Sequence, residues 1–190
     1  MRFSALFVAA LAVYLVSGCA SSVSPLYLKT DAVADPAIVG TWVGADIDTS
    51  GTFRVEAMKG GSYQVSTHYN ESRDEVVYEA RLVKLGSASF ADLIVTKLRH
   101  NGQDLDLPWG AVPLHEIVKY QVTGDDLAVF LISDDALSHS ALLPGFPLRF
   151  QDTEQDDNRV IISITDELRR YFSTHPAGIF SDPGHFKRQH

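Results

Sequence analysis

Short runs of alternating apolar and polar residues, separated by turn residues, dominate the chain from residue 38 onward. Such runs at regular spacing are typical of an all-β sandwich or barrel, because successive side chains of a strand point to opposite faces. Glycine-containing turns such as Gly60-Gly61 and Gly124-Asp125 separate the runs and favour antiparallel hairpins. The pattern predicts about eight strands. They fall at 38–47, 52–58, 62–69, 75–85, 88–98, 113–123, 127–133 and 158–164.

Eight is a number of antiparallel strands at which a barrel can close and leave no exposed edge. The predicted fold class is therefore mainly β, a single antiparallel barrel, with a β-sandwich as the alternative. Two segments have a helical pattern instead, a short helix near 133–143 and a C-terminal helix near 165–175. In the second, Leu168, Tyr171 and Phe172 fall on one face, which we expect to lie on the sheet.

The first residues have a different pattern, in which Arg2 precedes an apolar run that extends to Val16. The run is too short to cross a bilayer, which takes about 20 apolar residues. It has the length of the apolar region of a signal peptide. It ends in Val16-Ser17-Gly18-Cys19, and this cysteine is the only one in the chain.

This ending resembles the lipobox of bacterial lipoproteins, with Val16 where leucine is usual and Cys19 as the acceptor. The resemblance implies that residues 1–18 are removed as a signal peptide and that Cys19 carries a diacylglyceryl thioether. Acyl chains on Cys19 would then attach the protein to a membrane. Ala20 follows the cysteine where an Asp would imply inner-membrane retention, so the resemblance implies the outer membrane, facing the periplasm. The alternative is an ordinary secretory peptide in which Cys19 is incidental.

The mature chain divides by composition into three parts. Residues 19–36 are small, polar and proline-punctuated, and predict a lipidated N-terminus followed by a flexible tether. Residues 37–175 form the predicted β-rich globular domain. Residues 176–190 form a polar tail, which we expect to be loosely held except near Ile179 and Phe180.

The charge of the chain excludes some partners. Its 24 acidic and 16 basic residues give a formal net charge of −8. An acidic surface argues against nucleic acid and against electrostatic adhesion to anionic lipid. We therefore expect the acyl chains, and not the protein surface, to hold the molecule to the membrane.

The triplet Gly40-Thr41-Trp42 stands in the first predicted strand. A Gly-x-Trp triplet there resembles the lipocalin-like barrels, as does a helix after the last strand. The resemblance implies that Trp42 closes one end of the barrel. The alternative is that Trp42 is simply a core residue.

No motif indicates a catalytic residue, a metal site or a cofactor. His115-Glu116 begins like a zinc-protease helix, but Lys119 stands where the second histidine is required. We interpret His115 as a buried, hydrogen-bonded residue at the start of a strand. Ser138 and His139 are sequence neighbours, and adjacent side chains diverge on a helix, so they do not predict a catalytic pair.

Two apolar loops are the candidate contact surfaces. The loop 103–112 contains Trp109, and the loop 142–150 contains Phe146 between two prolines. Aromatic anchors carry much of the energy of binding, so Trp109 and Phe146 are the candidate ligand- or partner-binding residues.

The sequence thus predicts a lipid-anchored envelope protein whose barrel binds a small apolar ligand or an envelope protein. The alternative is a structural or assembly accessory with a solid barrel, which docks a partner through the loops 103–112 and 142–150. An envelope enzyme is the third class, and no residue pattern supports it.

Overall fold

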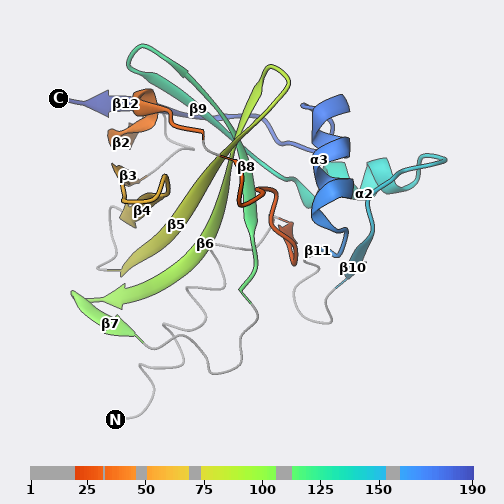
Figure 1. Ribbon diagram of the computed structural model, residues 1–190. Coiled ribbons are helices and arrows are strands. Elements are labelled where there is room, and N and C mark those ends of the chain that lie inside the picture. The colour runs from red at the N-terminus through yellow and green to blue at the C-terminus, as the bar shows by residue number, and fades with distance from the viewer. Residues whose placement is uncertain (1–19, 32, 46–50, 69–73, 106–112, 153–158) are drawn as a thin grey trace, which may run out of the picture.

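Eight antiparallel strands close into a barrel, which confirms the predicted fold class. The computed structural model describes residues 20–31, 33–45, 51–68, 74–105, 113–152 and 159–190. The barrel strands are β2 (Gly40–Gly44), β3 (Thr52–Ala57), β4 (Tyr63–His68), β5 (Asp74–Leu85), β6 (Ala88–His100), β8 (Glu116–Thr123), β9 (Asp126–Leu131) and β12 (Gly184–Gln189). Their order is β5-β4-β3-β2-β12-β9-β8-β6, and the pairing of β6 with β5 closes the ring (Figure 1).

Apolar residues fill the inner face of the barrel because they recur at every second position of its strands. Val55 of β3 pairs with Val65 of β4, which pairs with Tyr78 of β5, so one apolar row crosses three strands. The predicted hairpin turn between β3 and β4 is present. Its Gly60 and Gly61 have φ values of +87° and +79°, a region that favours glycine.

The last barrel strand comes from the segment 176–190, for which we predicted a loosely held tail. That prediction is wrong, because β12 pairs with both β2 and β9 and joins them into the ring. The predicted last strand at 158–164 contributes instead β11 (Arg159–Ile161), which lies between β1 (Ser21–Ser22) and β10 (Phe150–Asp152) in a separate three-stranded sheet.

The composition of β12 hides its alternation. Its exposed positions are His185, Lys187 and Gln189, and its half-buried positions include Phe186 and Arg188. With a cation on its inner face, a strand has the polar composition of a solvated tail. In the structure, carbonyl groups and an aromatic ring surround this cation.

One end of the barrel is closed by Trp42, by Arg188 and by the carbonyl groups that contact Arg188. The guanidinium lies 4.3 Å from the centre of the indole ring and donates to the carbonyls of Val39 and Ala37 at 2.5 and 2.6 Å. Trp42 is fully buried and donates from Nε1 to the carbonyl of Ile38 at 2.8 Å. A Cβ on Gly40 would lie 2.6 Å from Arg188 Nη1, so the glycine of the triplet makes room for the guanidinium. Trp42 is thus a buried core residue in contact with Arg188.

The segment after Cys19 is also docked, contrary to the predicted tether over 19–36. Ala20 is 3% exposed and Leu26 is completely buried. β1 runs parallel to β11, and η1 (Pro36–Ile38) leads into β2. The globular unit therefore extends beyond the predicted limits of 37–175 at both ends.

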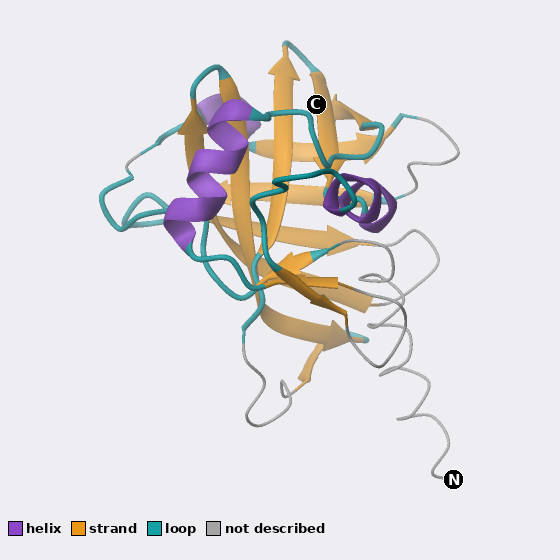
Figure 2. Cartoon of the chain, turned by 90° about the vertical axis from the view of Figure 1, so that its right-hand side faces the viewer, coloured by secondary structure: helices purple, strands orange, loops and turns teal. Residues whose placement is uncertain are grey.

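Both predicted helices are present, as α2 (Asp134–Ala141) and α3 (Thr165–Thr174). They lie with the three-stranded sheet on one side of the barrel (Figure 2). The predicted apolar face of α3, Leu168, Tyr171 and Phe172, is buried. Phe172 meets Phe90 of β6, with ring centroids 5.5 Å apart. Among the described residues, no helix is both long and apolar enough to span a membrane.

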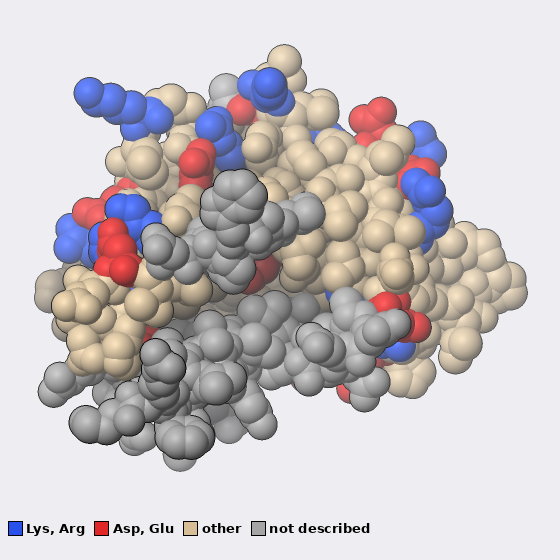
Figure 3. All heavy atoms as spheres, turned by 90° about the horizontal axis from the view of Figure 1, so that it is seen from below, with Lys and Arg blue, Asp and Glu red and all other residues tan. Residues whose placement is uncertain are grey.

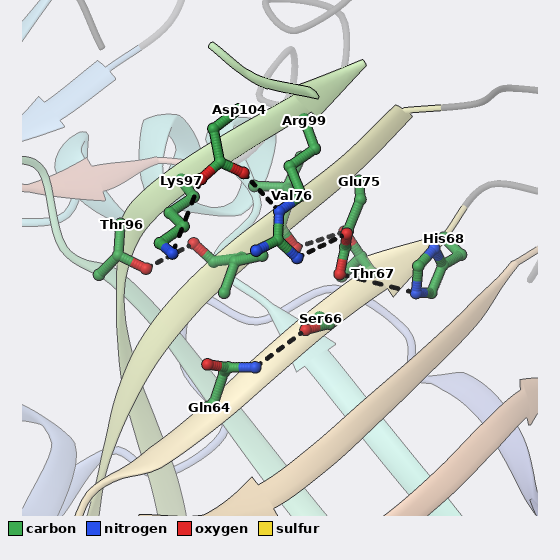
Figure 4. A network of polar contacts seen from close by, with 11 residues as sticks. Gln64, Ser66, Thr67, His68, Glu75, Val76, Thr96, Lys97, Arg99 and Asp104 are labelled. Carbon is green, nitrogen blue, oxygen red and sulfur yellow. Dashed lines mark hydrogen bonds and ion pairs between the residues drawn. The ribbon is translucent and has the colours of Figure 1, made fainter. Parts of the chain in front are cut away.

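A chain of ion pairs joins β4, β5 and β6 to the extra strand β7 (Gln103–Leu105) (Figure 4). Arg99 contacts Glu75 at 3.1 Å and Asp104 at 2.6 Å, and His68 lies 3.8 Å from Glu75. The hydrogen bond from Arg99 lowers the pKa of the Asp104 carboxyl. The pairs hold β7 beside the last residues of β6, with which it also pairs through the backbone.

Candidate functional site

An apolar cavity of about 390 Å³ lies inside the barrel. Side chains from strands all around the ring line it, among them Phe53, Val65, Leu93, Val129 and Phe186. Its volume falls in the range of small-ligand pockets, about 300–1,000 Å³.

The cavity lies toward one end of the barrel. Trp42, Arg188 and η1 close the other end, where Tyr120 also donates to the Asp35 carboxylate at 3.1 Å. The lining includes Gly51, His68, Leu131 and Asp182, which stand where β3 begins, β4 and β9 end and β12 begins. We call this end of the described barrel the open end, and the starts of β5 and β8, which belong to it, lie low in Figure 1.

One carboxyl group belongs to the wall of this cavity. Glu116 begins β8, two residues before the inward-facing Val118, and pairs in register with Leu93 of β6. Burial raises the pKa of Glu116 to about 7. Among the described lining residues there is no Lys or Arg, and the other ionisable side chains are His68, Tyr78, Tyr120 and Asp182. Near neutral pH Glu116 therefore changes between a hydrogen-bond donor and an anion within apolar walls.

A second acid, the buried Asp92, lies on the outer face of the same wall. It stands in β6 between Ala91 and Leu93, which both face inward. One carboxylate oxygen accepts from the backbone N–H of Leu26 at 2.5 Å, and the other lies 2.6 Å from Nδ1 of His115. Asp92 thus fastens the N-terminal segment to β6 and to the start of β8. We call Asp92, Leu26 and His115 the Asp92 clamp.

The clamp has the Asp–His half of a catalytic triad, but the nearby hydroxyl does not complete it. Ser22 forms a bridge with His115 through the backbone, and its hydroxyl donates to the carbonyl of Ser24 at 2.9 Å. The interpretation of His115 as a buried, hydrogen-bonded residue at a strand start is confirmed. In the described part of the chain, no cluster of three His, Cys, Asp or Glu side chains has the geometry of a metal site.

The structure does not gather the residues predicted to bind. Cys19 and Trp109 lie outside the described residues. Phe146 is half-buried and packs edge-on against Tyr171 of α3, with centroids 5.7 Å apart, away from the cavity lining. Next to it, Leu142 and Leu143 are exposed, Leu142 by 83%.

Sequence reasoning missed both acids, the half-buried Glu116 and the buried Asp92, although each leaves a signal. Glu116 shares the phase of Val118 and Tyr120, so the inward face of β8 begins with a carboxylate. Asp92 is the single charged residue between Ala88 and Thr96. A lone charge in an apolar strand requires buried partners.

Replacing Asp92 with Ala should release the N-terminal segment. The change leaves the Leu26 N–H and His115 Nδ1 without their shared acceptor, which should lower the free energy of unfolding by about 3 kcal/mol. Amide hydrogen exchange of residues 20–31 should then become faster than that of β6. The control is Asp126→Ala, whose side chain is exposed and should change stability by less than about 0.5 kcal/mol. Unchanged protection of residues 20–31 would contradict the role of the clamp.

Glu116→Gln should change how stability depends on pH. The folded protein holds the Glu116 proton up to about pH 7, whereas the unfolded chain releases it near 4.5. The contribution of the protonated Glu116 carboxyl to the free energy of unfolding is fully present below pH 4.5 and is lost as pH rises through 7. The variant side chain does not ionise, so its contribution does not fall with pH. The free energy of unfolding of the variant relative to the wild type should therefore rise between pH 5 and 8, by at most about 3 kcal/mol. Thermal unfolding of both proteins across this range measures it, and a constant difference would refute a buried carboxyl.

Comparison of the chain with known protein families, with curated proteins and with solved structures finds no match. The geometry of the barrel and its cavity is therefore the basis of the functional argument.

Proposed function

We propose that this protein is a lipid-anchored cell-envelope protein whose barrel binds a small, mainly apolar ligand. The observation that carries the binding function is the apolar cavity of about 390 Å³, whose described lining reaches one end of the barrel strands. Burial of apolar surface contributes about 25 cal/mol per Å², so a ligand that fills such a cavity gains most of its affinity from its apolar part.

The charge of the lining limits the ligand further. Glu116 and Asp182 are acidic, and no Lys or Arg belongs to the described lining. An anionic ligand would meet Glu116 without a compensating cation. A neutral polar group of the ligand can accept a hydrogen bond from the protonated Glu116 carboxyl. A basic group can pair with the Glu116 carboxylate. The proposed ligand is therefore an uncharged or cationic amphiphile.

The anchoring part of the proposal is supported by the lipobox Val16-Ser17-Gly18-Cys19. Two or three acyl chains hold a protein on a membrane almost permanently, because each buried CH₂ contributes about 0.8 kcal/mol. Since Ala20 and not Asp follows the cysteine, the proposed location is the outer membrane, on its periplasmic side.

A partner-docking accessory is the second candidate function, and the exposed Leu142 and Leu143 favour it. They follow α2 within the loop 142–150, one of the two loops predicted to make contacts. In this alternative the barrel would be a solid scaffold. The cavity supports ligand binding over it.

Ligand binding is tested with fluorescent amphiphiles on a form of the protein that begins after Cys19. A dansyl alkylamine should bind saturably, and more tightly than a dansyl fatty acid of equal length. Val65→Phe and Ala91→Leu narrow the cavity and should weaken binding at least about tenfold, since a blocked pocket loses more than about 1.4 kcal/mol. Ala128→Leu, between the inward-facing Leu127 and Val129 and so on the outer face of β9, is the matched control. No saturable uptake of either probe would refute the cavity as a binding site.

Anchoring is tested by Cys19→Ser in the producing bacterium. The variant has no acceptor sulfur and should leave the membrane fraction, whereas Lys29→Ala, an exposed change in the same segment, should remain there. Mass spectrometry of the wild-type N-terminal peptide should show an acylated Cys19. An unmodified cysteine, or a chain that still begins at Met1, would refute lipidation.

A further inference from the structure

The N-terminal segment reaches the barrel at the open end. Ala20 lines the cavity and donates from its backbone N–H to the carbonyl of Ile132 at 3.3 Å. Two residues later, Ser22 exchanges backbone hydrogen bonds of 2.8 Å with His115, which directly precedes β8. The chain therefore enters the described structure at the rim of the cavity.

Contacts with distant parts of the chain fix this segment in place. Leu26 is held by the Asp92 clamp, and its carbonyl accepts from Arg169 at 3.0 Å. Thr165 donates to the carbonyl of Pro25 at 2.7 Å, and Arg169 pairs with Asp31 at 2.7 Å. With residues 20–31 held by both the barrel and α3, there is no free tether between residue 20 and the barrel.

Covalent geometry then determines where an anchor on Cys19 must begin. Successive Cα atoms are about 3.8 Å apart, so an anchor attached one residue before Ala20 would begin close to this cavity residue. A lipid on its sulfur would enter the membrane beside the open end. The end closed by Trp42 and Arg188 would lie a full barrel length away.

The surface around this point is suited to lipid. Four apolar residues around it are exposed. Val23 directly follows Ser22, and the other three are sequence neighbours of residues that pair with Ala20 or Ser22, namely Leu114, Leu131 and Ile162. Figure 3 views this end from below. In the part drawn in colour, an expanse of tan surface lies between separate groups of Lys, Arg, Asp and Glu side chains. Apolar groups at the headgroup boundary add binding energy that an acidic protein does not obtain from charge.

We propose that the open end of the barrel faces the membrane that carries the anchor, so that the cavity opens onto the lipid surface. This inference rests on the proposed lipidation of Cys19 and does not require that the cavity be filled. Its consequence is that an amphiphile passes between bilayer and barrel without crossing bulk water. The docked segment, and not a chance encounter, sets this orientation.

The test uses the full-length acylated protein, extracted from membranes and reconstituted in phosphatidylethanolamine–phosphatidylglycerol vesicles with a nitroxide on the lipid headgroup. One fluorescent label is placed at the open end through Leu131→Cys, and another at the β5–β6 turn of the closed end through Ser87→Cys. Labelling is specific, because the only native sulfhydryl would be blocked as a thioether. The label at residue 131 should be quenched several-fold more strongly than the label at residue 87.

Equal quenching of the two labels, or stronger quenching at residue 87, would overturn the proposal. A variant with a 20-residue Gly-Ser spacer after Cys19 provides the control, since such a linker spans roughly 25 Å. The difference between the labels should shrink in this variant, and a difference that persists in full would show that the docked segment does not orient the barrel. Failure of lipidation is distinguishable, because the unacylated protein would not float with the vesicles at all.

Discussion

The buried carboxylate of Asp92 is the contact on which the arrangement of this molecule depends. Without partners, a charge inside a protein is strongly destabilising. Each of the two carboxylate oxygens of Asp92 has a hydrogen-bond partner, at 2.5 and 2.6 Å. Those partners belong to two other parts of the chain, the segment before the barrel and the residue that directly precedes β8. This acid thus joins three parts of the chain, and contacts with β11 and α3 hold residues 20–31 further.

Glu116 shows the opposite solution to the same problem on the other face of the wall. It is one residue beyond His115 in the chain, yet it faces the cavity, and burial alone raises its pKa to about 7. Asp92 is satisfied by the protein and acts as a structural clamp. Glu116 is left to be satisfied by a proton or, in the proposed function, by a ligand, and carboxyl groups with shifted pKa values cluster at functional sites. The alternation of side chains along the strands therefore places the Asp92 carboxylate and the Glu116 carboxyl on two faces of one wall.

Elements that depend on local patterns were predicted from the sequence, whereas features that depend on pairings between distant residues were missed. The turn glycines and the period of two predicted an antiparallel barrel, and the face formed by Leu168, Tyr171 and Phe172 predicted α3. The strand β12 was missed because Arg188 on its inner face is satisfied by the carbonyls of Ala37 and Val39, about 150 positions earlier. The docking of residues 20–31 was missed for the same reason, since Leu26 and its acceptor Asp92 are 66 positions apart. The cavity could not be predicted, because its volume depends on how all eight walls pack.

The docked N-terminus changes what a lipid anchor does. A long flexible tether leaves a domain free to rotate, so the anchor controls only its concentration near the membrane. Here the segment after Cys19 is held by hydrogen bonds of the barrel and of α3, so an anchor there would also control direction. The residues that hold the segment, Asp92 and His115, are neighbours of the cavity residues Leu93 and Glu116. Orientation toward the lipid and the chemistry of the cavity would then be set by adjacent residues of β6 and β8, so loosening the N-terminal segment would disturb both.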